Sequence, residues 1–135
     1  EIDFLSELPK DVIDLGFVSE EDKFLLLENA LALCQPSVNE SFSIVITESW
    51  LMGTPVIVHR DCSVTKSHVE QSNGGFIFGS KNELFSVFDK ISDPRFAKDI
   101  FGSSGRAYVQ QEYCWTSVLK RLQNAFIKMG LCDDF

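Results

Sequence analysis

The sequence has little positive charge. Its 135 residues include 12 Lys and Arg against 20 Asp and Glu, which gives a formal net charge of −8 at pH 7. Proteins that bind nucleic acid usually carry a basic surface, so we expect no nucleic-acid partner. Long hydrophobic runs are also missing, and no stretch reaches the length of a membrane-spanning helix. With 44% hydrophobic residues, the chain is long enough for one globular domain with its own core.

Patterns for metal sites and disulfides are missing as well. The chain has four cysteines, with no short spacing between any two, and two histidines: Cys34, Cys62, Cys114, Cys132, His59 and His68. Zinc sites usually need such ligands in closely spaced pairs, so we expect no metal. We interpret the cysteines as reduced, mostly buried thiols. No signal peptide is visible and the first residue is not a methionine, so we expect an excised piece of a cytoplasmic protein, with any membrane association supplied by its parent.

The stretch from residue 31 to residue 59 is the most informative. The apolar run at 31–34, closed by Pro36, predicts a buried strand, although a run this short could also end a helix. An amphipathic helix is predicted from about residue 41, and a Gly-Thr-Pro turn ends it. The run 56–59, which begins with three β-branched residues, predicts a second strand. A strand, a helix and a strand in this order are typical of a parallel crossover in an α/β domain.

Hydrophobic periodicity and turn signals predict the other elements. These are strands at 12–15 and 75–78, and helices at 20–30, 64–71, 81–91, from Asp93-Pro94 to about 112, and at 115–127. The prediction for the whole chain, 1–135, is therefore a single α/β domain with a Rossmann-like parallel sheet of about four strands flanked by helices. The apolar stripe of the last helix fits either a core position or a contact with a partner.

The start of the helix near residue 41 has the chemistry of a binding site. The first turn of a helix leaves backbone N–H groups unpaired and carries a partial positive charge, which suits a phosphate or diphosphate. Ser41 and Ser43 are placed to cap this end. Glu40 precedes the helix and Glu48 lies in it, so acceptors for sugar hydroxyls accompany donors for phosphate. Two Glu residues at this spacing alone would indicate only a solvated helix end.

The pattern Glu-x7-Glu, with Gly-Thr-Pro-Val-Ile-Val after the helix, resembles the donor-binding signature of retaining GT-B glycosyltransferases of group 1, or family 4. The resemblance implies that Glu40 faces the transferred sugar and acts in catalysis, and that Glu48 binds the ribose hydroxyls of the nucleotide. It also implies contacts to the donor from Ser41, Phe42, Ser43 and Ile44, and base contacts from the backbone of Phe17 and Val18. The family commonly has Gly where this chain has Ser43.

The resemblance extends over about residues 16–130, which is less than a whole enzyme of this type. Such enzymes have an N-terminal acceptor domain, and their donor domain begins with a Gly-rich turn and a basic pair that grip the diphosphate; neither precedes Gly16 here. We therefore expect the C-terminal part of a donor domain, inactive by itself. The implied substrates are a nucleotide-sugar donor and a sugar, lipid or protein acceptor, with no cofactor. Arg60 and Lys66 follow the strand predicted at 56–59, at the edge where ligands of such sheets bind, so they are candidates for phosphate contact.

Two other functions remain open from the sequence. The first is a sugar-nucleotide epimerase or a phosphorylase on the same fold, in which a similar helix start binds phosphate. The Glu-x7-Glu spacing does not favour it, because those enzymes need a different acid/base set. The second is a non-catalytic α/β module whose helices bind another protein. Binding of nucleotide sugars would separate this second alternative from the enzymes.

Overall fold

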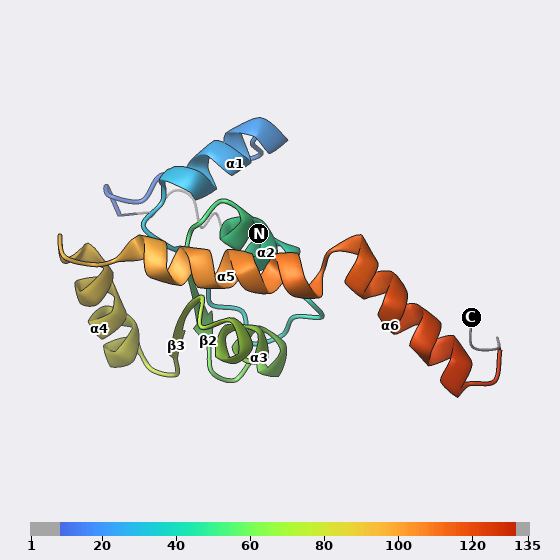
Figure 1. Cartoon of the computed structure of the whole chain (residues 1–135). Coiled ribbons are helices and arrows are strands. Elements are labelled where there is room, and N and C mark those ends of the chain that lie inside the picture. The colour runs from blue at the N-terminus through green and yellow to red at the C-terminus, as the bar shows by residue number, and fades with distance from the viewer. Residues whose placement is uncertain (1–8, 132–135) are drawn as a thin grey trace, which may run out of the picture.

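The structure, a computed structural model, describes residues 9–131, which form an α/β fold around a small parallel sheet (Figure 1). Within these residues the sheet has three strands, β1 (Leu33–Gln35), β2 (Val56–His59) and β3 (Gly75–Phe78), in the order β1-β2-β3. Leu33 lies opposite Val56, and Val56 lies opposite Gly75. Parallel strands need crossover connections, and here each connection is a helix. The predicted Rossmann-like α/β class is confirmed.

Six helices accompany the sheet. They are α1 (Glu20–Asn29), α2 (Ile44–Leu51), α3 (Ser63–Ser72), α4 (Lys81–Ser92), α5 (Lys98–Glu112) and α6 (Trp115–Lys128). The predicted helices at 20–30, 64–71, 81–91 and 115–127 agree with α1, α3, α4 and α6 to within a residue or two. No helix in the described part of the chain is long and apolar enough to cross a membrane.

The core lies on both faces of β2, the central strand. Val56 and Val58 face one side, where they pack with residues of α2, α3 and α5. Ile57 faces the other side, where it packs with Phe78 of β3 and Ile91 of α4. Successive side chains of a strand point to opposite faces, so a strand covered on both sides has a continuous apolar sequence. This explains why the β-branched run could be recognised as a buried strand.

Two glycines let α5 pass very close to α2. A Cβ atom on Gly102 would lie 1.9 Å from the carbonyl oxygen of Gly53, and one on Gly105 would lie 2.1 Å from Cδ1 of Trp50. The indole of Trp50 is fully buried and donates a hydrogen bond to the carbonyl oxygen of Gly74 at 2.8 Å. The glycines disfavour a helix by intrinsic propensity, yet α5 is continuous through them because they make this contact possible.

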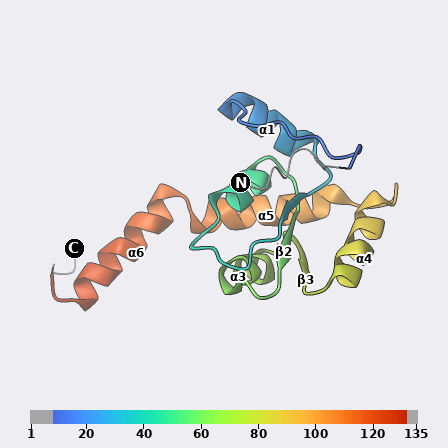
Figure 2. The same cartoon turned by 180° about the vertical axis from the view of Figure 1, so that it is seen from behind.

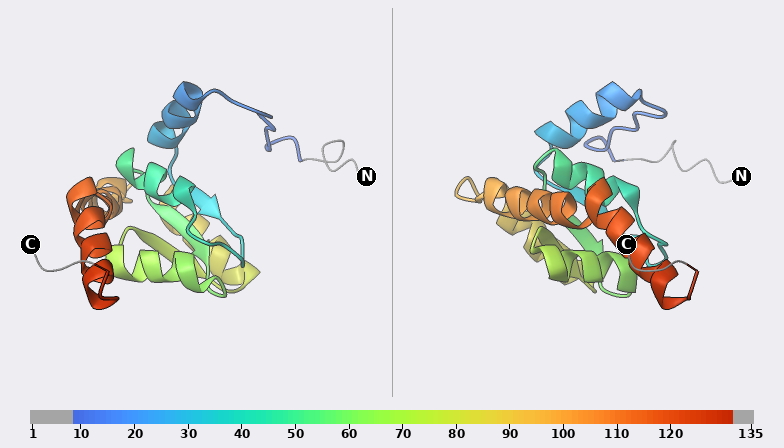
Figure 3. Two further views of the ribbon diagram at one scale, coloured as in Figure 1. Left: turned by 90° about the vertical axis from the view of Figure 1, so that its right-hand side faces the viewer. Right: turned by 45° about the vertical axis from the view of Figure 1, so that its right-hand side comes forward.

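The predicted strand at 12–15 is wrong. These residues form no strand, and Val12, Ile13 and Leu15 are all at least half exposed. The chain turns just after them, where the N–H of Gly16 donates to Oδ1 of Asp14 at 2.8 Å and Gly16 has a φ of +58°. The segment before α1 does not join the sheet (Figure 3). A strand needs a neighbour to take its hydrogen bonds, and none of the described residues offers one here.

The predicted helix start at Asp93-Pro94 is also wrong, because α5 begins at Lys98. The carboxylate of Asp93 accepts a hydrogen bond from the backbone N–H of Arg95 at 2.8 Å and pairs with its guanidinium. The N–H of Phe96 donates to the carbonyl oxygen of Asp93 at 2.8 Å. An Asp side chain that accepts a hydrogen bond from the backbone N–H two residues ahead favours a turn. Asp93-Pro94 therefore forms a turn before α5 and not its first turn.

The last helix, α6, extends away from the rest of the chain (Figure 1 and Figure 2). No residue of α6 is buried. Its apolar stripe is exposed, including Trp115 at 78%, Leu119 at 54% and Leu122 at 49%. Of the two interpretations of this stripe, a position in the core is therefore wrong for the part of the chain that the structure describes.

The expectation of mostly buried cysteines is wrong too. Of the three cysteines within residues 9–131, Cys62 is buried, whereas Cys34 and Cys114 are exposed. All three are free thiols in the structure. Cys132 lies outside the described residues. Cys34 is exposed because it lies on β1, at the edge of the sheet, where a side chain has fewer neighbours than on β2.

Candidate functional site

The loop between β1 and α2 is held at the carboxyl end of β1 by one amide side chain. Nε2 of Gln35, the last residue of β1, donates to Oε1 of Glu40 at 3.0 Å and to Oγ of Ser43 at 3.4 Å. Ligands of open parallel sheets bind outside the carboxyl ends of the strands, so this loop lies where a ligand is expected. Gln35 was not among the site residues predicted from the sequence. Its only signal is an amide directly before the Pro-Ser that ends the strand.

The helix α2 starts later than predicted, at Ile44 rather than near Ser41. Ser43 has the N-cap position, but its side chain makes no capping bond, and Ser41 is exposed outside the helix. The prediction that Ser41 and Ser43 cap the helix is therefore wrong. The N–H of Ile46 donates to the carbonyl oxygen of Ser43 at 3.1 Å. This leaves the amides of Ile44 and Val45 at the open end of the helix.

Ser43 has a backbone conformation that usually belongs to glycine. Its φ is 66° and its ψ is 72°, in the left-handed region, and the residue is 8% exposed. A Cβ atom disfavours this region, whereas Gly enters it freely. The preference of the resembling family for Gly at this position thus has a local cause, since the chain must bend sharply between the strand and the helix.

We predict that Ser43→Gly raises the free energy of unfolding by about 1 kcal/mol. The left-handed conformation costs a non-Gly residue roughly 1–2 kcal/mol, and the greater freedom of Gly in the unfolded chain offsets part of the gain. Urea denaturation of the chain measures the change. Ser43→Ala is the matched control, because it removes the hydroxyl and keeps the Cβ, and it should gain nothing. Equal stability of the two variants would contradict a strained Ser43.

Phe42 turns inward and fixes the loop against α3 and α5. Its ring meets the imidazole of His68 and the ring of Tyr113 edge-on, each at 5.2 Å between centroids. Nδ1 of His68 lies 3.0 Å from the hydroxyl of Tyr108 and 3.4 Å from that of Tyr113. Burial lowers the pKa of His68 and raises that of Tyr108, so both are neutral near pH 7. His68 is thus a packing residue whose polar partners are two tyrosine hydroxyls.

Glu48 lies on α2, one turn after its start, and is paired. Its Oε1 accepts a hydrogen bond from Nζ of Lys23 at 2.9 Å, and the two side chains are 20% and 26% exposed. The other oxygen of the carboxylate has no partner among the described residues. Lys23 was not singled out from the sequence. It lies 25 positions before Glu48, and no local pattern connects the two.

The two cations proposed for phosphate contact are engaged elsewhere. Arg60 pairs with Glu83 of α4 at 2.8 Å, and Lys66 pairs with Glu70, one turn further along α3, at 3.6 Å. The guanidinium of Arg60 and the backbone N–H of Gly79 hold the pKa of Glu83 below its usual range. Both pairs are partly exposed, so a ligand phosphate can compete for these cations. Within residues 9–131 no hydrogen bond or ion pair joins either cation to the loop before α2.

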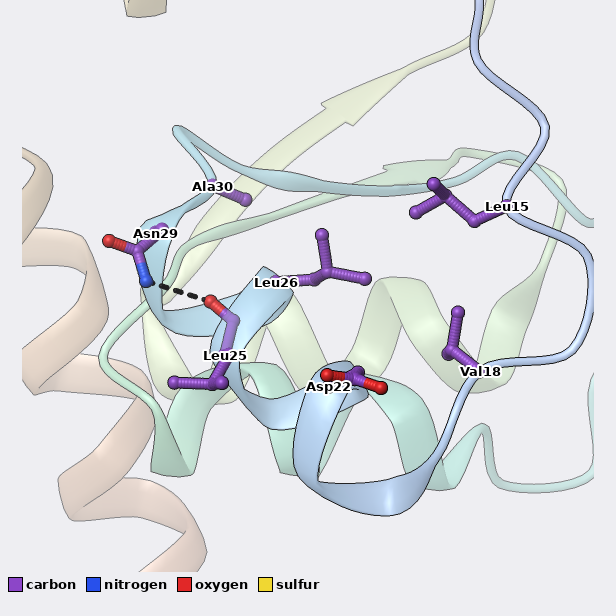
Figure 4. A pocket seen from close by; sticks show the side chains of 7 residues that line it. All are labelled: Leu15, Val18, Asp22, Leu25, Leu26, Asn29 and Ala30. Atoms are coloured by element: carbon purple, nitrogen blue, oxygen red, sulfur yellow. Dashed lines mark hydrogen bonds between the residues drawn. The ribbon is translucent and has the colours of Figure 1, made fainter.

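A cavity of about 710 Å³ lies against α1 and not beside the Glu40 loop. Leu15, Val18 and Leu26 point into it, and Asp22, Leu25, Asn29 and Ala30 complete its wall (Figure 4). The lining is mostly apolar and includes neither Glu40 nor Glu48, so we do not assign it to a nucleotide sugar. Within residues 9–131 no hydrogen bond connects Phe17 or Val18 to either Glu, and Phe17 is fully exposed.

The described residues contain no cluster of three or more His, Cys, Asp or Glu side chains that could hold a metal ion. The candidate site consists of the Glu40 loop, the amides of Ile44 and Val45 at the start of α2, and the paired Glu48, at the carboxyl end of a parallel sheet. The fold is that of an α/β protein with a Rossmann-like parallel sheet.

Comparison with protein families agrees with this class. The family model described as glycosyl transferases group 1 matches residues 5–92, more than half of the chain. The chain therefore belongs to the group 1 glycosyltransferases, a family that implies an enzyme as the parent protein and a sugar donor and an acceptor as its substrates. The match includes β1 to β3 and the whole candidate site, whereas α5 and α6 lie beyond it. No solved structure matches the chain significantly.

Proposed function

We propose that the chain is the donor-binding portion of a retaining GT-B glycosyltransferase of the family 4 type. One observation carries the proposal: Glu40 and Glu48 flank the start of α2, whose Ile44 and Val45 amides are open, at the carboxyl end of β1. Oxyanions bind at such helix starts, and carboxylates accept bonds from sugar hydroxyls. One edge of the sheet thus offers groups for each part of a nucleotide diphosphate sugar.

The roles follow from chemistry and position. The open amides of α2 would bind the diphosphate and stabilise the negative charge that develops on it as the glycosidic bond breaks. Glu40, which Gln35 holds at the loop, would orient the transferred sugar, and Glu48 would accept bonds from the ribose. The ring of Phe42 packs in the aromatic cluster, so Phe42 would meet the donor through its backbone. Ser41 is exposed in the same loop and would also contact the donor. Phe17 and Val18 would meet the base through their backbone.

The sheet supports the proposal that this is one half of a donor domain. Doubly wound dinucleotide folds have the strand order 3-2-1-4-5-6, and β1-β2-β3 fits the consecutive half, 4-5-6. In that order the segment 12–15 would be strand 3, separated from β1 by two other strands. If the first two strands belong to a preceding segment, the segment 12–15 has no strand to pair with here. The apolar cavity on α1 is then the place that the preceding segment would cover. That segment would also bring the cations for the diphosphate and join the acceptor domain.

The proposal is tested by titrating the ¹⁵N-labelled chain with UDP, GDP and ADP and following its amide resonances. We expect the largest shifts at Ser43, Ile44 and Val45 for at least one of the three. Without the cations, binding should be in the millimolar range, only about 4 kcal/mol. Glu48→Ala should weaken the nucleotide but not inorganic pyrophosphate, which has no ribose. Saturable shifts confined to other parts of the chain, or none, would overturn the proposal.

A further inference from the structure

We propose that Lys23 is a positioning residue for the donor: it sets the carboxylate of Glu48 in the orientation that accepts the ribose diol. This inference rests on the proposed function and assigns a role to a residue outside the predicted site. Lys23 lies in the first turns of α1, and its Nζ is 2.9 Å from Oε1 of Glu48 on α2. The two helices are neighbours, with α1 lying over α2 (Figure 1).

The bond to Lys23 occupies only one of the two carboxylate oxygens of Glu48. A carboxylate has two oxygens and about four acceptor positions, and a vicinal diol presents two O–H donors. Lys23 occupies one position on Oε1 and leaves Oε2 open. A glutamate side chain without this contact would sample several rotamers, and ordering it on binding would cost free energy. The ammonium supplies that order before the donor arrives.

The bond from Lys23 to Glu48 is an additional contact of this ammonium group. Lys23 already has a partner on its own helix, since Glu20 accepts from its Nζ with both oxygens, at 3.0 and 2.9 Å. Of the two bonds, the one to Glu48 is part-buried, with the side chains of Lys23 and Glu48 only 26% and 20% exposed, so it restrains the carboxylate more than a solvated pair would. The bonds to Glu20 and Glu48 raise the pKa of Lys23, so the ammonium stays charged between two carboxylates. Without it, both charges would repel an incoming diphosphate.

Lys23 also connects the two ends of the proposed nucleotide site. The last turn of α1 is held separately, because Thr54 donates to the carbonyl oxygen of Leu27 at 2.6 Å and Lys98 donates to that of Glu28 at 2.8 Å. Lys23 holds the first turn, directly after the Ser19 cap and the Phe17-Val18 segment. The helix that directly follows the residues proposed for the base is thereby joined to the helix that carries the residue proposed for the ribose.

The test compares ribose and 2′,3′-dideoxyribose forms of one nucleoside diphosphate, chosen as the tightest binder among UDP, GDP and ADP. We expect Lys23→Met to weaken the ribose form about fivefold, the effect of one hydrogen bond, and to change the dideoxy form far less. Lys23→Arg should recover part of the loss. Glu20→Ala is the matched control, because it removes the other partner of Lys23 and leaves the bond to Glu48. It should not weaken the ribose form.

Each other outcome has a definite meaning. If Glu48→Ala weakens the ribose form but Lys23→Met does not, the role of Lys23 is wrong and the donor site stands. Equal loss for the ribose and dideoxy forms would mean a general charge or folding effect, which also overturns the positioning role. If no nucleoside diphosphate binds the unchanged chain, the donor site fails, and the role of Lys23 fails with it.

Discussion

Gly102→Ala is expected to lower the free energy of unfolding by about 3 kcal/mol, although alanine is the better helix former. Propensity alone would favour the variant by about 1 kcal/mol. The new Cβ, however, would lie 1.9 Å from the carbonyl oxygen of Gly53, and that oxygen cannot move without its backbone. The helices α2 and α5 would have to separate, which disrupts the packing around Trp50, and overpacking of a core costs about 1–3 kcal/mol or more.

Denaturant unfolding of the chain measures this effect. The control is Ser103→Ala, next to Gly102 on the exposed side of α5, which should change stability by about 0.5 kcal/mol or less. Gly105→Ala should behave like Gly102→Ala, because its Cβ would meet the indole of Trp50 at 2.1 Å. A Gly102→Ala variant more stable than the unchanged chain would show that the two helices do not approach as closely as described.

In the parent enzyme, Glu40→Ala is expected to lower kcat about 10- to 100-fold with little change in the KM of the donor. Hydrogen bonds to charged groups contribute roughly 1.5–3 kcal/mol, and a carboxylate at the transferred sugar acts where the geometry changes during the reaction. Glu48→Ala should do the reverse and mainly raise KM, because ribose contacts are the same in the ground and transition states.

Steady-state kinetics with varied donor concentration distinguishes the two variants. Gln35→Ala is an informative companion, since it leaves Glu40 in place and removes the amide that holds its Oε1. It should show a smaller loss of kcat in the same direction. If Glu40→Ala acts on KM and Glu48→Ala acts on kcat, the two roles are exchanged and the orientation of the donor must be reversed, while the family and the fold are unaffected.

The central part of the fold could be predicted because its signals are local. The run at 56–58 is apolar on both faces, and the turn before it has a glycine with a φ of +77° at Gly53. The strand at 75–78 and helices α3, α4 and α6 also follow from periodicity and turn residues within each segment. The start of α2 was placed too early because Ser41 and Ser43 look like caps, and nothing local shows that Ser43 adopts a left-handed conformation.

What the sequence could not show depends on contacts between distant segments. The Lys23–Glu48 pair joins residues that are 25 positions apart, and the Phe42–His68–Tyr113 cluster joins three segments. The segment at 12–15 has the composition of a strand, but strand formation is decided by a neighbour that the described residues do not contain. Conversely, Gly102 and Gly105 look like helix breakers until the close approach of α2 is known.

The open edge of β1 has a consequence for handling the chain. β1 pairs with β2 on one side, and within residues 9–131 nothing pairs with its other side. An unpaired edge is a template onto which another chain can add a strand, and the exposed thiol of Cys34 lies on it. Because β1 is only three residues long, this self-association should be weak and dependent on concentration. Dilute, reducing conditions should therefore keep the isolated chain in solution.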